Sequence, residues 1–188
     1  MESLHLLRFI MANRHKLLKT VVLLGLGSAL STCDFVAEPP LCGDYFGGGE
    51  TPGFSINANG LAQHLDTGTS WYRCPAGMTF AASRCRGEML LATWDEAMAY
   101  AVEFSESSGR NWRLPENDEL LAIQESSCRN PAINHFVFPG IDVANHWTSS
   151  ETWHNEAFRC AVYTYQGDLS CREFRNNAYP FLLVLDNN

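Results

Sequence analysis

Three carboxylates lie close together in the sequence, at Glu116, Asp118 and Glu119. Paired acids of this kind can serve as the general acid and base of an enzyme. They follow Pro115, however, at the expected start of a helix, where the helix dipole favours negative charge. The cluster therefore has a structural explanation and does not by itself indicate catalysis.

A second group with reactive side chains is His146 followed by Ser149 and Ser150. A nucleophile needs an adjacent base, but turn capping explains the two serines equally well. Four histidines follow residue 33, at positions 64, 135, 146 and 154 (His64, His135, His146 and His154). They share no spacing typical of metal ligands, such as i, i+4. We therefore expect no catalytic residue, no metal and no cofactor.

The segment from Trp153 to Glu156 has side chains suited to ligand binding. Trp153 is the one large ring in a polar stretch, and it either folds back onto the core or forms a binding platform. His154 titrates near neutral pH, Asn155 donates and accepts hydrogen bonds, and Glu156 accepts them. We expect these four residues to bind sugar hydroxyls or a polar peptide.

The N-terminal 32 residues have the pattern of a secretory signal peptide. Four cations at Arg8, Arg14, Lys16 and Lys19 precede an apolar run over residues 20–30. That run is shorter than the roughly 20 apolar residues of a membrane-spanning helix. Met11 is an alternative start that keeps a complete signal.

Residues 30–33, Leu-Ser-Thr-Cys, resemble a bacterial lipobox, which favours acylation of Cys33. Thr32 departs from the usual Gly, Ala or Ser, so cleavage by a signal peptidase near residues 29–31 is the alternative. Asp34 resembles a signal for retention in the inner membrane. We expect a protein of the bacterial cell envelope, anchored to the membrane by lipid and facing the periplasm.

Residues 33–188 are strongly acidic, with nine arginines, no lysine and 20 acidic residues, a formal net charge of −11. Nucleic acid, anionic lipid surfaces and heavily sulfated polysaccharides need a cationic face. The charge argues against all three as main partners.

Residues 33–60 are rich in Pro and Gly and are predicted to form a flexible tether, pinned at Cys42. Residues 61–188 have the apolar density and the length of one domain.

Two helices are predicted in this domain. Thr93 and Glu96 form a capping box before an apolar stripe that ends at residues 107–109, and a second helix follows Pro115. Strands are expected over 161–165 and 179–185, which gives an α+β layout.

Six cysteines follow Cys33, enough for three disulfides with fifteen possible connectivities. If Tyr163 and Asp168 close a four-residue hairpin loop, Cys160 and Cys171 face each other at a non-hydrogen-bonded site. Cys74 and Cys85 bracket a small hairpin around residues 75–77. By elimination, Cys42 joins Cys128.

Several motifs over residues 65–185 together resemble the DUF1566 family and are similar to the C-terminal domain of Legionella collagen-like adhesins. They are Asp66-Thr67-Gly68 with Trp71, Cys74 with Cys85, Thr93-Trp94 with Glu96-Ala97, Trp112-Arg113-Leu114-Pro115 with Glu119-Leu120, residues 130–134, Phe138-Pro139 and residues 147–150. The resemblance implies a C-type-lectin-like fold, with two helices packed on a small, looped antiparallel sheet. Glu116 stands where the family usually has a Ser or Thr helix cap, and residues 181–185 lack the family's usual Val-Arg-Cys-Val-Arg ending.

The large side chains of these motifs are expected to build the architecture. Trp94, Trp112 and Trp147 are predicted to anchor the core. Arg113 is predicted to clamp loop carbonyls, since buried charges are paired.

The leading functional hypothesis is an envelope binding module that recognises a glycan or an envelope protein. The alternatives are an enzyme that remodels an envelope substrate and a structural subunit of a surface assembly. The resemblance implies binding more often than catalysis.

Overall fold

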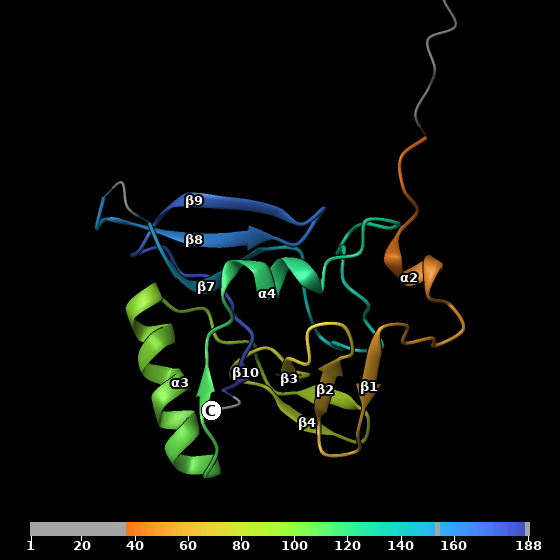
Figure 1. Cartoon of the computed structure of the whole chain (residues 1–188), viewed down its shortest axis with the longest axis horizontal. Helices are drawn as coiled ribbons and strands as arrows, with labels where there is room; N and C mark the ends of the chain where they lie inside the picture. Colours follow the sequence, from red (N-terminus) through yellow and green to blue (C-terminus); the bar gives the residue numbers. More distant parts are fainter. Residues whose placement is uncertain (1–36, 153–154, 187–188) are drawn as a thin grey trace, which may run out of the picture. The chain divides into compact units, whose positions relative to one another are not determined.

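The computed structural model of the chain describes residues 37–152 and 155–186, and residues from Pro39 onward form one compact unit (Figure 1). Its helices are α2 (Cys42–Tyr45), α3 (Trp94–Ser108) and α4 (Asn117–Ala122). Its strands are β1 (Phe54–Ile56), β2 (Leu61–His64), β3 (Ser70–Tyr72), β4 (Thr79–Ala81), β5 (Arg84–Arg86), β6 (Trp112–Arg113), β7 (Asn145–Glu151), β8 (Phe158–Tyr163), β9 (Asp168–Phe174) and β10 (Val184–Leu185).

The strands form three antiparallel sheets. Five strands pair in the order β1-β2-β3-β10-β6, two form the hairpin β4-β5, and three pair in the order β7-β8-β9. Helix α3 contacts β6 and β7, and α4 contacts β7 and β8. The predicted α+β class is confirmed.

Local signals explain both longer helices. At α3, the Thr93 hydroxyl accepts from the Glu96 N–H, and the Glu96 carboxylate accepts from the Thr93 N–H, so the predicted capping box is present. The helix ends at Gly109, whose φ of 67° suits a residue without Cβ. At α4, the Glu119 carboxylate accepts from the Glu116 N–H at 2.8 Å.

The three predicted tryptophan anchors are buried. Trp147 is fully buried and its indole N–H donates to the Ala92 carbonyl at 2.8 Å. Trp94 donates to the Thr148 carbonyl, and Trp112 donates to the Ser108 hydroxyl. Each ring thus packs in the core with its one polar group satisfied.

The predicted flexible tether is wrong for residues 41–60. These residues include α2 and the edge strand β1, and the rings of Phe46 and Phe54 are buried. Phe54 packs edge-on against Phe138, with ring centroids 5.6 Å apart. Two buried rings and a disulfide at Cys42 outweigh the entropy of a stretch rich in Gly and Pro.

The three disulfides join the predicted pairs. They are Cys42–Cys128, Cys74–Cys85 and Cys160–Cys171. They indicate an oxidising, extracytoplasmic compartment.

The surroundings of two disulfides differ from the prediction. Tyr163 does pair with Asp168, but the strand register shifts between Arg159 and Ala161, so Cys160 lies at a β-bulge instead of a regular non-hydrogen-bonded site. The small hairpin near Cys85 turns between β4 and β5, at residues 82–83, and not at residues 75–77.

The strand boundaries also need correction. The predicted strand 161–165 is β8, Phe158–Tyr163, and of the predicted strand 179–185 only β10 pairs as a strand. Tyr179 forms an isolated bridge with Ala92, and the Leu183 carbonyl accepts from Tyr72. The signal over 1–32, Cys33 and Asp34 lie outside the described residues.

No helix in residues 37–152 and 155–186 is long and apolar enough to cross a bilayer.

Candidate functional site

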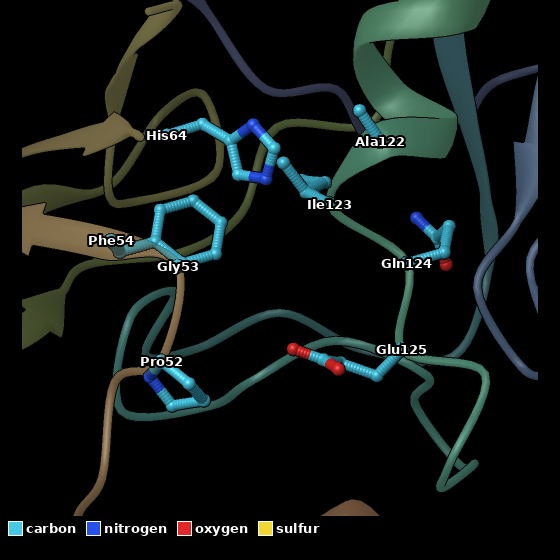
Figure 2. Close-up of a pocket in the computed structure, with 8 residues that line it drawn as sticks. All are labelled: Pro52, Gly53, Phe54, His64, Ala122, Ile123, Gln124 and Glu125. Carbon is cyan, nitrogen blue, oxygen red and sulfur yellow. The ribbon is translucent and has the colours of Figure 1, made fainter. Parts of the chain in front are cut away.

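A pocket of about 260 Å³ lies between the first two strands and the end of α4 (Figure 2). We call it the β2–α4 pocket, and its lining residues are Pro52, Gly53, Phe54, His64, Ala122, Ile123, Gln124 and Glu125. The register of β1 and β2 places Phe54 directly opposite His64, with ring centroids 5.0 Å apart. The other wall is formed by the end of α4 at Ala122 and by residues 123–125, which run along the side of the pocket opposite β1 (Figure 2).

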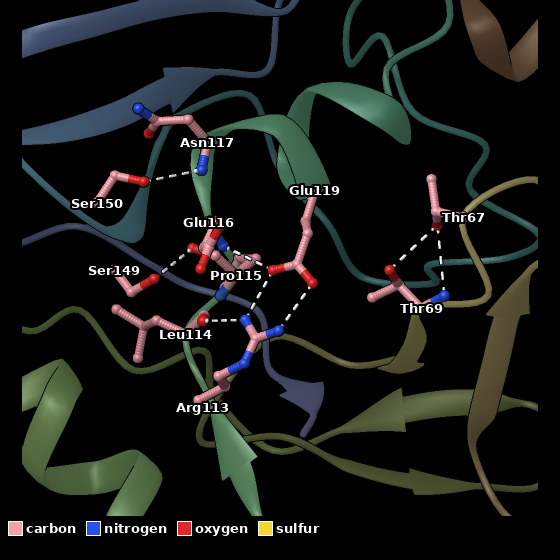
Figure 3. A network of polar contacts seen from close by, with 10 residues as sticks. All are labelled: Thr67, Thr69, Arg113, Leu114, Pro115, Glu116, Asn117, Glu119, Ser149 and Ser150. Atoms are coloured by element: carbon pink, nitrogen blue, oxygen red, sulfur yellow. Dashed lines mark hydrogen bonds and ion pairs between the residues drawn. The ribbon is translucent and has the colours of Figure 1, made fainter. Parts of the chain in front are cut away.

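His64 is held in one orientation by the turn that follows β2. Its Nδ1 lies 2.9 Å from the Thr67 hydroxyl, and that hydroxyl donates to Thr69 at 3.1 Å (Figure 3 shows the two threonines). The Thr67 hydroxyl can accept from Nδ1–H or donate to Nδ1, so the contact orients the ring in either tautomer. Nε2 lies on the side of the ring that faces Ile123 and the pocket (Figure 2).

Glu125 supplies the acidic group of the pocket. Its N–H donates to the Ala132 carbonyl at 2.7 Å, which fixes the backbone where the chain leaves α4. Burial raises the pKa of the Glu125 carboxyl. Within residues 37–152 and 155–186, no hydrogen bond or ion pair reaches this carboxylate, which points across the pocket toward Pro52 (Figure 2).

The neighbouring Gln124 has a structural role instead. Its Nε2 donates to the Leu120 carbonyl at 3.0 Å, and its Oε1 lies beside Gly167 in the β8–β9 turn. The polar groups available to a ligand are therefore the imidazole of His64 and the carboxylate of Glu125. Phe54, Ile123 and Pro52 form the apolar wall beside them.

This arrangement provides hydrogen-bond acceptors and apolar contact. Among the described residues, no group of three or more His, Cys, Asp or Glu side chains is placed to hold a metal ion. The pocket also lacks a serine, cysteine or lysine that could act as a nucleophile. Its chemistry fits the binding of a ligand that donates hydrogen bonds.

The ligand loop predicted from the sequence is described only in part. Trp153 and His154 lie outside the described residues. Asn155 and Glu156 are exposed, but the Asn155 side-chain oxygen accepts from the Ala157 N–H at 2.8 Å. The Glu156 carbonyl accepts from Arg159 at 2.9 Å.

The carboxylates at the start of α4 form a structural network (Figure 3). Arg113 donates to both oxygens of Glu119, at 2.7 and 2.9 Å, and to the Leu114 carbonyl at 3.1 Å. Burial raises the pKa of the Glu119 carboxyl, but the hydrogen bonds from Arg113 and Glu116 and the charge of Arg113 outweigh it, so the pKa is lower than usual.

The prediction that Arg113 clamps loop carbonyls is correct for one carbonyl, that of Leu114. The main partner of Arg113 is the Glu119 carboxylate. Arg73 clamps a loop through two carbonyls. Its guanidinium donates to the carbonyls of Phe136 and Val137, at 2.6 and 2.8 Å, and stacks on Phe80.

The structure does not pair His146 with the serines that follow it. The Ser150 hydroxyl accepts from the Asn117 N–H, and the Ser149 hydroxyl donates to the Pro115 carbonyl (Figure 3). His146 is fully buried, and its Nδ1 bonds to the Ala144 carbonyl at 3.1 Å. These contacts are those of a strand packed on a helix start.

Sequence reasoning missed both His64 and Glu125 as site residues. They are far apart in the sequence and share no motif spacing, so only the fold brings them together. The one sequence feature that pointed to His64 is the Asp66-Thr67-Gly68 turn, because Thr67 of this turn holds the His64 ring.

Comparison with known proteins gives one result. A family model described as the Lcl C-terminal domain matches residues 60–185. No curated protein and no solved structure matches the chain.

Proposed function

The chain belongs to the Lcl C-terminal domain family, and we propose that it is an adhesin-like binding module of the bacterial cell envelope that recognises a glycan or protein ligand in the β2–α4 pocket. The resemblance to the C-terminal domain of collagen-like adhesins supports this proposal, as do the three disulfides of an extracytoplasmic domain. The two longer helices and the looped antiparallel sheets support a C-type-lectin-like arrangement.

One observation carries the proposal. The β2–α4 pocket holds a carboxylate that is partly desolvated and that no described residue contacts by a hydrogen bond or ion pair. Desolvating a polar group without a partner destabilises the fold. A ligand with hydrogen-bond donors would supply the missing partner.

The proposed attachment is a lipid on Cys33, with Asp34 directing the protein to the periplasmic face of the inner membrane. Mass spectrometry of the N-terminus of the protein purified from membranes tests this proposal. A diacylated Cys33 is the expected result. A mature chain that starts at any other residue contradicts it.

Binding is tested by measuring how the purified, oxidised protein is retained on immobilised envelope polysaccharides and envelope proteins. Glu125→Ala is expected to abolish retention. Glu106→Ala is the matched control, because it removes the same charge from the exposed face of α3. Equal retention of the two variants would show that the ligand binds elsewhere.

Trp153→Ala addresses the loop predicted from the sequence. Loss of retention with an unchanged melting temperature would make this loop part of the ligand site. A melting temperature lowered by several degrees would assign Trp153 to packing. Chemical change of the retained ligand would favour the alternative of an envelope-remodelling enzyme, and retention only within a multi-subunit complex would favour a structural subunit.

A further inference from the structure

We infer that the β2–α4 pocket accepts a lysine side chain of a protein partner, with the ammonium group at the Glu125 carboxylate and His64 in the opposite wall. The inference rests on the proposed function and names the chemical group that is recognised. Three properties of the pocket carry it: the type of its polar groups, its charge and the shape of its apolar wall.

The polar groups of the pocket can both accept hydrogen bonds. Glu125 offers carboxylate oxygens, and His64 offers Nε2 in the tautomer whose Nδ1–H donates to Thr67. An ammonium group carries three donors and no acceptor, so it complements this set. A guanidinium carries five donors in a fixed plane and would leave more of them without a partner.

The charge of the surroundings favours a cation. No described residue forms an ion pair with Glu125, and no Arg or Lys is among the residues that line the pocket. Residues 33–188 carry a formal net charge of −11, which attracts cationic partners at long range. A bound ammonium would also oppose the desolvation that raises the pKa of Glu125.

The apolar wall selects an alkyl chain over a sugar ring. Phe54 is only 9 % exposed and Ile123 only 3 %, so neither side chain presents an open face on which a sugar could stack. Pro52, which is exposed beside them, offers the apolar surface for the methylene groups of lysine. The ammonium of an amino sugar would reach the same acceptors without this contact.

A divalent cation is a poorer fit for the same position. One carboxylate and one imidazole are fewer ligands than stable sites use, and no third His, Cys, Asp or Glu joins them among the described residues. An organic cation, which brings its own apolar surface, uses the pocket more completely.

The experiment titrates the oxidised protein with Nα-acetyl-lysine methylamide and follows backbone amide shifts by NMR. We expect saturable shifts at residues 53, 54, 64 and 122–125. Nα-acetyl-norleucine methylamide, which lacks the ammonium group, and glucosamine, which lacks the alkyl chain, should each bind at least tenfold more weakly. Glu125→Gln should weaken lysine binding at least tenfold, whereas the control Glu106→Gln should leave it unchanged.

A second measurement reports the contact at the carboxylate itself. Carboxyl-carbon NMR should show that the pKa of Glu125 falls when the lysine probe is present, because a bound cation stabilises the charged form. Equal binding of the norleucine probe, tighter binding of glucosamine, or an unchanged Glu125 pKa would overturn the inference.

The two proposals fail in different ways. If the lysine probe does not bind while Glu125→Ala still abolishes retention on envelope ligands, the pocket is the ligand site and the lysine assignment is wrong. If Glu125→Ala leaves retention unchanged, the pocket is not the ligand site and the proposed function fails at its first step.

Discussion

Arg113 and Glu119 form a bidentate ion pair that joins β6 to the first turn of α4, with nitrogen–oxygen distances of 2.7 and 2.9 Å. The same carboxylate accepts from the Glu116 N–H, so one side chain secures both the ion pair and the helix start. A planar guanidinium suits this geometry better than an ammonium group does.

Glu119→Gln should lower the free energy of unfolding by about 1 kcal/mol at pH 7, since the pair is partly exposed and water screens it. Because the folded pKa of Glu119 is depressed, its contribution is fully present above the unfolded pKa of about 4.3 and is lost as the pH falls through the folded value. Urea unfolding of both proteins from pH 7 to pH 3 measures the difference. A difference that does not shrink below about pH 4 would contradict this role.

His146 should make stability depend on pH in a different window. Burial lowers its pKa to about 4, although its hydrogen bond to the Ala144 carbonyl acts in the opposite direction. The unfolded chain titrates near pH 6.5, so the unfolded state binds more protons between these two values, and stability is lost as the pH falls from about 6.5 to about 4. The loss should reach about 3 kcal/mol.

His146→Leu tests this prediction and should remove the slope between pH 6.5 and pH 4. The substitution suits the site because Nε2 has no partner within the described residues. The Ala144 carbonyl also keeps its bond from the Thr164 N–H. An unchanged slope in the variant would assign the pH dependence to other groups.

The disulfides should differ in what their removal costs. Cys42–Cys128 closes a loop with a sequence separation of 86, against 11 for Cys74–Cys85. Chain entropy gives about 4–5 kcal/mol for the longer loop and about 3 kcal/mol for the shorter one. Paired Cys→Ser variants, compared by urea unfolding, should follow that order, and the reverse order would contradict it.

Thr67 should act as a positioning residue for His64. Thr67→Val removes the hydroxyl that contacts Nδ1, so the tautomer balance of the His64 imidazole should change, as measured by imidazole nitrogen shifts. Retention on the envelope ligand should weaken a few-fold with little change in melting temperature. Thr67→Ser keeps the hydroxyl and is the matched control, and a Val variant with an unaltered tautomer would refute the assignment.

Local signals made much of the fold predictable. The Thr93 capping box and Gly109 set both ends of α3, and the Tyr163–Asp168 turn defined the last hairpin. Each of these signals depends on residues close together in the sequence. The bulge at Cys160 was not foreseen, because it depends on how β9 pairs beyond the turn.

The tether prediction failed because composition averages over a segment. Residues 41–60 are rich in Gly and Pro, but Phe46 and Phe54 find partners that are distant in the sequence, such as Phe136 and Phe138.

The β2–α4 pocket also depends on contacts between residues that are distant in the sequence. No local pattern relates His64 to Glu125, since only the packing of β1 and β2 beside the end of α4 places them together.

The bond between Cys42 and Cys128 also determines how the domain carries mechanical load. A pull on the chain ahead of residue 42 passes through the disulfide into the loop that follows α4, only three residues from Glu125. The force therefore bypasses β1, an edge strand that would otherwise separate from β2 one hydrogen bond at a time. Reduction of this one bond would therefore expose β1 directly to a pull applied ahead of residue 42.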